Sequence, residues 1–237
     1  MRINLEKCIG CMECVPYCPA EAIIATGNKF MVDEDRCFEC YICIRAEICP
    51  VDAFQKVPLK WPRTLRHLFS SMTMIHKGTG IDGRGTAEMK TNDVTGRYHH
   101  GEVGFTVDVG RPGVGTTFED VEKISMAVGK IGVEFEKMNP VTKLMSHKST
   151  GRIRDDIKME RILSCVLEFK TKDTKTVSII NALRDVAKLV STVFSVGCIC
   201  RCKPDGTVPV KSILDEADIF YRPNGKINIG LGHPLAP

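Results

Sequence analysis

The stretch Cys8-Ile9-Gly10-Cys11-Met12-Glu13-Cys14-Val15-Pro16-Tyr17-Cys18-Pro19 opens the chain and decides its fold. Its cysteines follow the spacing C-x2-C-x2-C-x3-C-P. The run returns at Cys37, Cys40, Cys43 and Cys49-Pro50, with five residues instead of three before the last cysteine. Three cysteines at this spacing fit a tight loop around one corner of an iron–sulfur cube, and each cube needs four thiolates. Eight thiolates therefore predict two 4Fe–4S clusters in a protein that moves single electrons.

Disulfides and zinc are the alternative explanations for 12 cysteines in 237 residues. Residues 1–8 contain no apolar core of an export signal, so we expect a cytoplasmic protein in which disulfides do not persist. Zinc sites usually show separated C-x2-C pairs, not three cysteines in triplet spacing followed by C-P. The pattern therefore favours iron–sulfur clusters, and clusters of this type favour a largely anaerobic setting.

Residues 1–57 closely resemble the bacterial two-cluster ferredoxins in this motif. The resemblance implies that the two halves exchange their fourth ligand. It assigns one cluster to Cys8, Cys11, Cys14 and Cys49, and the other to Cys37, Cys40, Cys43 and Cys18. The duplication extends past the cysteines, because C-P-A-E-A-I at 18–23 is echoed by C-P-V-D-A-F at 49–54.

Size, hydrophobicity and charge limit the class of protein. A chain of 237 residues with 43% hydrophobic residues can form one or two ordinary domains. No stretch approaches the roughly 20 apolar residues of a membrane span, and a net charge of +4 does not suggest nucleic acid. Residues 1–57 carry six basic and nine acidic residues, hence −3, whereas the remainder carries +7. An acidic carrier can steer its docking to a basic redox partner; a solvated acidic face without a partner explains the charge equally well.

The expected fold class is α+β, with an N-terminal two-cluster ferredoxin domain (1–57) followed by an α/β domain (101–237). The first domain should contain a hairpin of strands 22–26 and 29–32. A glycine-rich connector (58–100) joins the two domains, and a helix at 63–74 is expected within it.

Alternating and helical periodicities place the elements of the second domain. The pattern predicts strands at 102–109, 163–169 and 193–202, helices at 118–138 and 176–190, and a terminal hairpin turning at Asn224-Gly225. Strand–helix–strand order in this rhythm implies a βαβ crossover and a parallel pair.

A loop between the first strand and first helix of this domain is the candidate cofactor-binding site. Glycines permit close backbone approach, and helix N-termini attract anions, so the loop could hold a flavin phosphate, a nucleotide or an acidic substrate. A plain turn with a threonine cap is the alternative, since no nucleotide fingerprint is present. The residues are Gly110, Arg111, Gly113, Gly115, Thr116 and Thr117.

Cys198, Cys200 and Cys202 suggest a third metal centre. On a straight strand, however, the outer pair would lie about 13 Å apart, too far for one ion. We therefore expect small buried hydrophobes here, and likewise at Cys165. The adjacent His99 and His100 should point to opposite faces, which argues against a joint metal site.

Three further stretches resemble, as a set, iron–sulfur proteins of anaerobes akin to 6-hydroxynicotinate reductase. They are 83–97, then 101–105 running into 110–113, and 224–232. This resemblance implies ferredoxin-linked reduction of a heteroaromatic ring, with a flavin in the system.

Three functions compete, of which the first two are an oxidoreductase or a component of one. The first is an electron-transfer protein or subunit that feeds an anaerobic reductase, with the second domain docking the partner. The second is a self-contained reductase that binds a small-molecule substrate or flavin at the 110–117 loop, with 82–97 as a lid. The third is a regulator that does not carry electrons, in which the state of the clusters controls an interaction surface of the second domain. We rank the three functions in this order because the sequence shows no clear nucleophile, acid–base pair or nucleotide motif.

Overall fold

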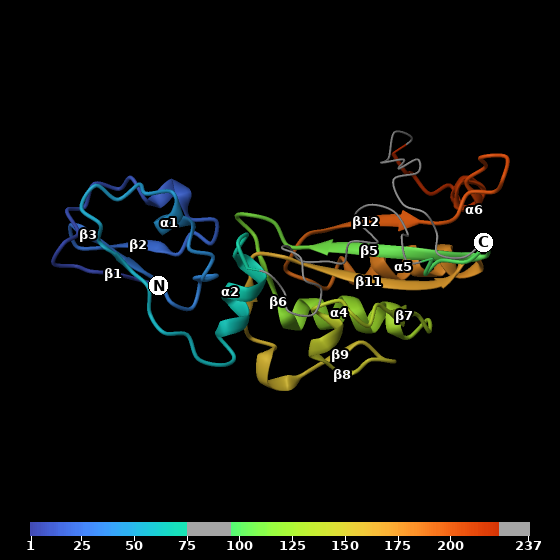
Figure 1. Ribbon diagram of the computed structural model, residues 1–237, viewed down its shortest axis with the longest axis horizontal. Helices are drawn as coiled ribbons and strands as arrows, with labels where there is room; N and C mark the ends of the chain where they lie inside the picture. Colours follow the sequence, from blue (N-terminus) through green and yellow to red (C-terminus); the bar gives the residue numbers. More distant parts are fainter. Residues whose placement is uncertain (75–95, 223–237) are drawn as a thin grey trace.

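The computed structural model describes residues 1–74 and 96–222. A small cysteine-rich unit (residues 1–57) lies at one end of the molecule and a larger sheet unit (residues 102–219) at the other (Figure 1). The helix α2 (Thr64–Ser70) lies between them. It is shorter than the helix predicted over 63–74.

The cysteine-rich unit consists of short elements arranged around two antiparallel pairs, β1 with β4 and β2 with β3. The predicted hairpin is confirmed, and Gly27 adopts φ +62 at its turn, a conformation that glycine reaches without steric cost. The elements are β1 (Arg2–Ile3), η1 (Val15–Tyr17), β2 (Ile23–Thr26), β3 (Lys29–Val32), α1 (Ile42–Arg45) and β4 (Phe54–Gln55).

The duplication seen in the sequence recurs in the backbone. Equivalent positions of the two halves adopt the same left-handed conformation, which is uncommon for residues other than glycine. The two residues added between Cys43 and Cys49 coincide with the α-helical turn α1, where the first half has the 3-10 turn η1. The matching pairs of φ angles are Gly10 +74 and Glu39 +52, Met12 +68 and Tyr41 +59, and Glu21 +49 and Asp52 +46.

The sheet unit is built on a four-stranded sheet with the order β12-β5-β11-β7. Its main elements are β5 (Glu102–Val109), α4 (Phe118–Gly129), β7 (Glu134–Phe135), β11 (Cys165–Lys172), α5 (Thr176–Val186), β12 (Phe194–Ile199) and α6 (Pro209–Glu216). Smaller elements decorate it: β6 (Thr116–Thr117), η2 (Thr142–Leu144), β8 (Met145–His147), β9 (Arg152–Ile153), η3 (Asp155–Ile157), β10 (Arg161–Ile162) and η4 (Asp173–Lys175).

Every hydrogen-bonded strand pair in this sheet is antiparallel, so the predicted parallel pair is wrong. Strands β11 and β12 run in the same direction, but β5 lies between them and pairs with both. In the same way, β11 separates β5 from β7. The order β-α-β-β-α-β is thus a split arrangement, in which each helix joins two strands separated by an antiparallel neighbour. Periodicity cannot reveal this, because it reports the face of a strand and not its neighbours.

The core of the sheet unit lies between one face of the sheet and the paired helices α4 and α5. The alternating residues Val103, Phe105, Val107 and Val109 are fully buried, which confirms the strand expected at 102–109. Helix α4 ends at Gly129, not at 138, and the chain turns at Gly132 with φ +80 into β7.

The remaining differences concern the C-terminal third. Helix α5 ends at Val186 rather than at 190, and β12 ends at Ile199 rather than at 202. Helix α6 was not predicted, although its apolar residues Val210 and Leu214 join the core. The predicted hairpin at Asn224-Gly225 lies outside the described residues. Within 1–74 and 96–222, no helix combines the length and apolar character needed to cross a membrane.

Candidate metal centres

Two pockets of similar size lie in the cysteine-rich unit, with empty volumes of about 310 Å³ for the first along the chain and about 350 Å³ for the second. The first cysteine pocket is lined by the thiols of Cys8, Cys11, Cys14 and Cys49. The triplet reaches it from the loop after β1, and Cys49 reaches it from the other half of the repeat. The rest of its lining is mainly apolar.

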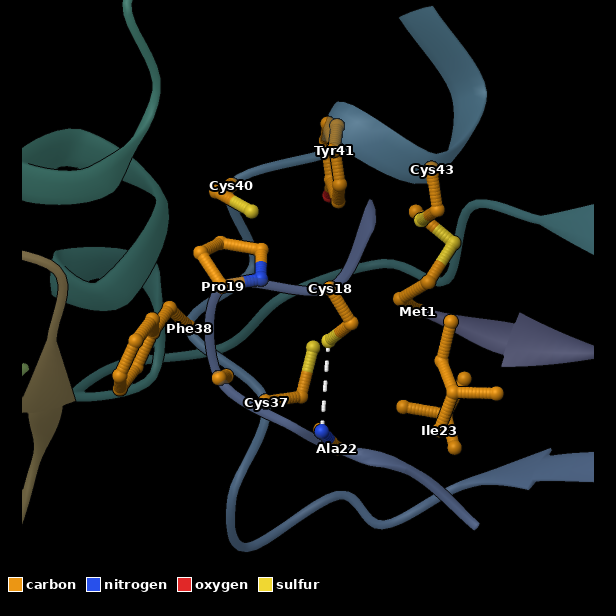
Figure 2. Close-up of a pocket in the computed structure, with 12 residues that line it drawn as sticks. Met1, Cys18, Pro19, Ala22, Ile23, Cys37, Phe38, Cys40, Tyr41 and Cys43 are labelled. Atoms are coloured by element: carbon orange, nitrogen blue, oxygen red, sulfur yellow. Dashed lines mark hydrogen bonds between the residues drawn. The ribbon is translucent and has the colours of Figure 1, made fainter. Parts of the chain in front are cut away.

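The second cysteine pocket is lined by Cys18, Cys37, Cys40 and Cys43 (Figure 2). Here the triplet comes from the second half, and Cys18 comes from the first. The two pockets therefore each combine three cysteines of one motif with the last cysteine of the other. This is the grouping that the ferredoxin resemblance implies, while ligation itself stays a prediction.

Backbone amides point at the sulfurs that cross between halves. Ala22 N donates to Cys18 Sγ at 3.3 Å, and Ala53 N donates to Cys49 Sγ at 3.2 Å, four residues along in each case. A third amide, Glu39 N, donates to Cys37 Sγ at 3.4 Å. Such N–H donors stabilise negative charge on sulfur, and hydrogen bonds to the sulfurs are one of the factors that set cluster potentials.

Burial raises the pKa of the Cys37 thiol to about 11 and of the Cys43 thiol to about 12. A thiol in this environment is protonated at neutral pH unless a metal draws off the proton. Coulombic repulsion from the other thiols of the same pocket further raises the pKa of Cys43. In the first pocket, burial is the main cause that raises the pKa of Cys14, and coulombic repulsion from the other thiols adds to it. Bound iron would offset the free-energy cost of deprotonating these buried thiols, because it would hold them as thiolates.

The donor set fits an iron–sulfur group better than a single ion. Four thiols and an apolar lining meet in each pocket, with amides directed at sulfur. In the described parts of the chain, no three metal-ligating side chains approach closely enough for one metal ion. A multi-iron cube instead uses cysteines spread around its corners.

A buried charge network lies beside the second pocket. The carboxylate of Glu39, which is fully buried, accepts hydrogen bonds from the N-terminal amine of Met1 at 2.8 and 3.0 Å and from Arg63 at 2.6 Å. The carbonyl of Glu39 also bonds His67 Nδ1 at 2.6 Å, and the His67 ring lies 4.3 Å from that of Tyr41. The equivalent position in the first half is Gly10, which has no side chain to form such a network.

Arg66 of α2 ties the second cysteine motif to the sheet unit. Its Nη1 donates to the carbonyl oxygens of Glu34, Asp35 and Cys37 at 3.0 to 3.1 Å. Its Nε forms a 2.5 Å ion pair with Glu160, and both side chains are largely buried. A guanidinium can serve all these acceptors because its donors form a rigid planar fork.

The second cysteine pocket also contacts the sheet unit directly, at what we call the junction. Phe38 is 1% exposed, and its ring lies so close to Gly115 that a Cβ there would fall 2.3 Å from it. The guanidinium of Arg161 lies 5.9 Å over the same ring. Gly113 N donates to Pro19 O at 2.8 Å, directly beside Cys18. In Figure 2 the Phe38 side chain points away from the sulfurs.

The candidate loop at 110–117 thus forms part of this junction. Arg111 donates to the carbonyl of Gly110 and to Ser195 Oγ at 2.7 and 2.8 Å, and Thr117 caps α4 by accepting from Asp120 N at 3.2 Å. Thr116 of β6 pairs with Ile162 of β10. An anion would have to displace these contacts, and the phosphate or substrate site stays a prediction.

The C-x-C-x-C cysteines differ from expectation. Cys198 and Cys202 are exposed, so the expectation that they are buried is wrong, whereas Cys200 packs against the core and Cys165 is 1% exposed. Strand β12 ends before Cys200, so the three residues do not share one straight strand.

Sequence reasoning missed the junction residues Phe38, Glu39, Arg66 and Arg161. A signal existed for Glu39, because a charged residue replaces glycine between two cysteines of a repeat. Arg66 and Arg161 carried no such signal, since their partners lie far away along the chain.

Comparisons with known proteins cover this same N-terminal region. Two family models, both described as a 4Fe–4S binding domain, match residues 1–24 and 34–52. A ferredoxin of Methanothermococcus thermolithotrophicus is 43% identical over 54 residues, which are 22% of this chain and 87% of that protein. No solved structure gives a significant match.

Subunits of a larger enzyme are similar over the same span. Pyruvate synthase subunit PorD of Methanocaldococcus jannaschii is 43% identical over 56 residues, 23% of this chain and 63% of that subunit. PorD of Thermotoga maritima is 40% identical over 57 residues, 24% of this chain and 56% of that subunit. The matched segment therefore spans about 60% of these two relatives.

Proposed function

We propose that this chain, which belongs through its N-terminal residues to the ferredoxin family, is an electron-transfer protein or subunit that feeds an anaerobic reductase. The coarser conclusion, a ferredoxin-like iron–sulfur electron carrier, follows from the family. The proposal adds two 4Fe–4S clusters, a reductase as the recipient, and a role for the sheet unit in presenting the carrier to it. When bound, such clusters supply reversible one-electron transfer.

The observation that carries the proposal is the crossed grouping of thiols in two pockets of similar size. Cys8, Cys11, Cys14 and Cys49 would hold one cluster, and Cys18, Cys37, Cys40 and Cys43 the other. The residues around the second pocket direct an amide at sulfur and fix the second motif to the sheet unit through Arg66. The subunit role draws support from the two PorD relatives, whose names describe a subunit of pyruvate synthase.

A redox titration of anaerobically purified protein, followed by electron paramagnetic resonance, tests this function. We expect reversible uptake of about two electrons per chain, one for each cluster, at low potential. A signal that accounts for only one electron, or a protein without any cluster signal, would rule out a two-cluster carrier.

A self-contained reductase is the second candidate, favoured by the resemblance of 83–97, 101–113 and 224–232 to 6-hydroxynicotinate reductase-like proteins. Residues 83–95 of the first stretch and the whole of the last stretch lie outside the described residues. This candidate requires flavin in the purified protein, or turnover of a heteroaromatic acid with reduced protein alone. Flavin bound in stoichiometric amount would place it ahead of the carrier role.

A further inference from the structure

The two cysteine pockets are equivalent in the repeat but differ in what covers them. In the second half, the residue after the first cysteine is Phe38, which is 1% exposed beneath Gly115 and Arg161 of the sheet unit. In the first half, the same position is Ile9, which is 63% exposed. The second cysteine of each motif shows the same contrast, since Cys40 is buried and Cys11 is exposed.

The opening in the first half continues along its loop. Met12, the equivalent of Tyr41, is 59% exposed, and it lines the first cysteine pocket together with Ile9 and Cys11. None of the described residues that line the second pocket is exposed. Leu5 and Tyr17, at 45% and 49%, extend the apolar character on either side in sequence. We call Leu5, Ile9, Cys11, Met12 and Tyr17 the open rim.

We propose that the open rim is the docking face for a separate redox protein with a basic contact surface. The internal repeat supplies the argument: the equivalent face of the second half is already covered by a folded protein surface, the sheet unit. That covering surface brings a close-packed backbone at Gly115 and a cation, Arg161, over the aromatic ring. A partner at the open rim would pack against Ile9 and Met12 in the same manner.

Charge specifies the partner further. Glu6 and Glu13 are exposed and lie between residues of the open rim in the sequence, with the exposed Lys7 next to Glu6, and the whole cysteine-rich unit carries a net charge of −3. Such a face favours a partner with Arg or Lys around an apolar centre, and its association should weaken with salt. Apolar anchors surrounded by polar residues are the usual anatomy of a protein–protein contact.

This inference rests on the proposed electron-transfer function, so its test must separate the two. The probe is cytochrome c, a basic one-electron carrier, mixed under argon with the full chain whose iron and sulfide contents have been measured. Binding is measured by calorimetry at about 0.01 M ionic strength, where the Debye length is about 30 Å, and again at about 0.15 M. A chain without iron and sulfide would refute the proposed function; a loaded chain with unaltered binding would refute only the docking face.

Two sets of variants test the apolar and the charged parts. We expect Ile9→Ser with Met12→Ser to weaken binding about tenfold or more. The control Met159→Ser with Leu189→Ser, at two even more exposed apolar positions of the sheet unit, should change nothing. Glu6→Gln with Glu13→Gln, which leaves the apolar side chains intact, should weaken binding at low salt and flatten its salt dependence. Its control is Asp185→Asn with Glu216→Gln.

The outcomes decide the proposal. Hydrogen-exchange protection of residues 5–17 in the complex, together with the losses above and unchanged iron content, supports it. Equal affinity of wild type and the rim variants would overturn it, as would protection confined to the sheet unit. Failure of the wild-type chain to bind cytochrome c at low salt would also overturn it, because the basic partner is part of the proposal.

Discussion

The two residues between the first pair of cysteines decide how each pocket is surrounded. In the first half they are Ile9 and Gly10; in the second they are Phe38 and Glu39. Phe38 packs against Gly115, and Glu39 forms ion pairs with the Met1 amine and with Arg63. The same backbone conformation thus serves an open pocket and a covered one.

Paired cysteine substitutions test which thiols share a cluster. We expect Cys14→Ala and Cys49→Ala each to leave about four irons per chain, and the double variant to leave about four as well, because both residues serve one cluster. Cys14→Ala with Cys18→Ala should leave almost none, since it damages both sites. Iron and sulfide assays under argon measure this, with Cys200→Ala as a control that keeps the full content.

The crossed ligand sets would be wrong if the Cys14 and Cys18 double variant kept half of its iron. Loss of all iron from the double variant Cys14→Ala with Cys49→Ala would also contradict the crossed ligand sets. Each double variant therefore serves as the control for the other.

Two glycines of the junction loop give a matched pair of substitutions. Both have positive φ, +66 at Gly115 and +86 at Gly113, but only at Gly115 would a new Cβ meet the Phe38 ring. We expect Gly113→Ala to destabilise the fold by about 1 kcal/mol through backbone strain. Gly115→Ala should cost about 1–3 kcal/mol more, the usual effect of overpacking.

Thermal unfolding under argon measures both variants. Adding Phe38→Leu to Gly115→Ala should recover part of the loss, because it shortens the side chain that the new methyl group meets. Equal destabilisation by the two alanines would show that Phe38 does not press on Gly115.

At the scale of elements, α2 holds the two units together. Arg66→Met would leave three backbone carbonyls and the Glu160 carboxylate without their donor in a largely buried site. We expect a loss of about 3–5 kcal/mol in unfolding free energy, as for other broken buried pairs. Arg2→Met, which removes an exposed pair with Glu34, should cost less than about 1 kcal/mol.

Denaturant titrations of both variants make the comparison. Adding Glu160→Gln to Arg66→Met should restore part of the stability, since it removes the unpaired buried charge. If Arg66→Met costs no more than Arg2→Met, α2 does not fix the second motif through this side chain.

Several helices and strands could be predicted from the sequence. Where a prediction differs from the structure, the difference has a physical cause. Alternation at Val103, Phe105, Val107 and Val109 identified β5, because burial on one face imposes a period of two. Periodicity also found α4 but carried it past Gly129, where the chain turns toward β7. The antiparallel order of the sheet depends on contacts far apart in sequence, which no local pattern contains.

At the scale of the whole molecule, the two units differ in what stabilises them. In the described residues, the buried core cluster of the cysteine-rich unit comprises seven of its own residues together with Leu163 of the sheet unit, whereas the cluster of the sheet unit and α2 comprises 25. Small domains with little core usually depend on metals or other cross-links. The cysteine-rich unit should therefore depend on its clusters to stay folded.

Removal of the clusters by chelation and mild oxidation tests this dependence. Amides of β2 and β3 should lose hydrogen-exchange protection, while amides of β5 and β11 should keep theirs, because metal binding and folding are coupled only in the first unit. Uniform loss in both units would show that the sheet unit has no independent stability.

One part of the candidate site could be predicted from the sequence, and another part could not. The cysteine spacing carried the resemblance to two-cluster ferredoxins, and that resemblance implied the grouping of thiols that the two pockets show. The covering of the second pocket by Gly115 and Arg161 depends on the packing of two units, and no spacing encodes it. The loop at 110–117 was predicted to bind an anion because its glycines permit a close approach to the backbone. The sequence does not show whether a ligand or, as at Gly115, another side chain makes that approach.

Iron and acid-labile sulfide per chain, measured together with zinc on protein purified without air, test the central claim most directly. Crossed thiol pockets that each hold a cube require about eight irons and eight sulfides. Zinc in place of iron, or about four irons with no sulfide, would contradict the claim that this chain is a two-cluster electron carrier.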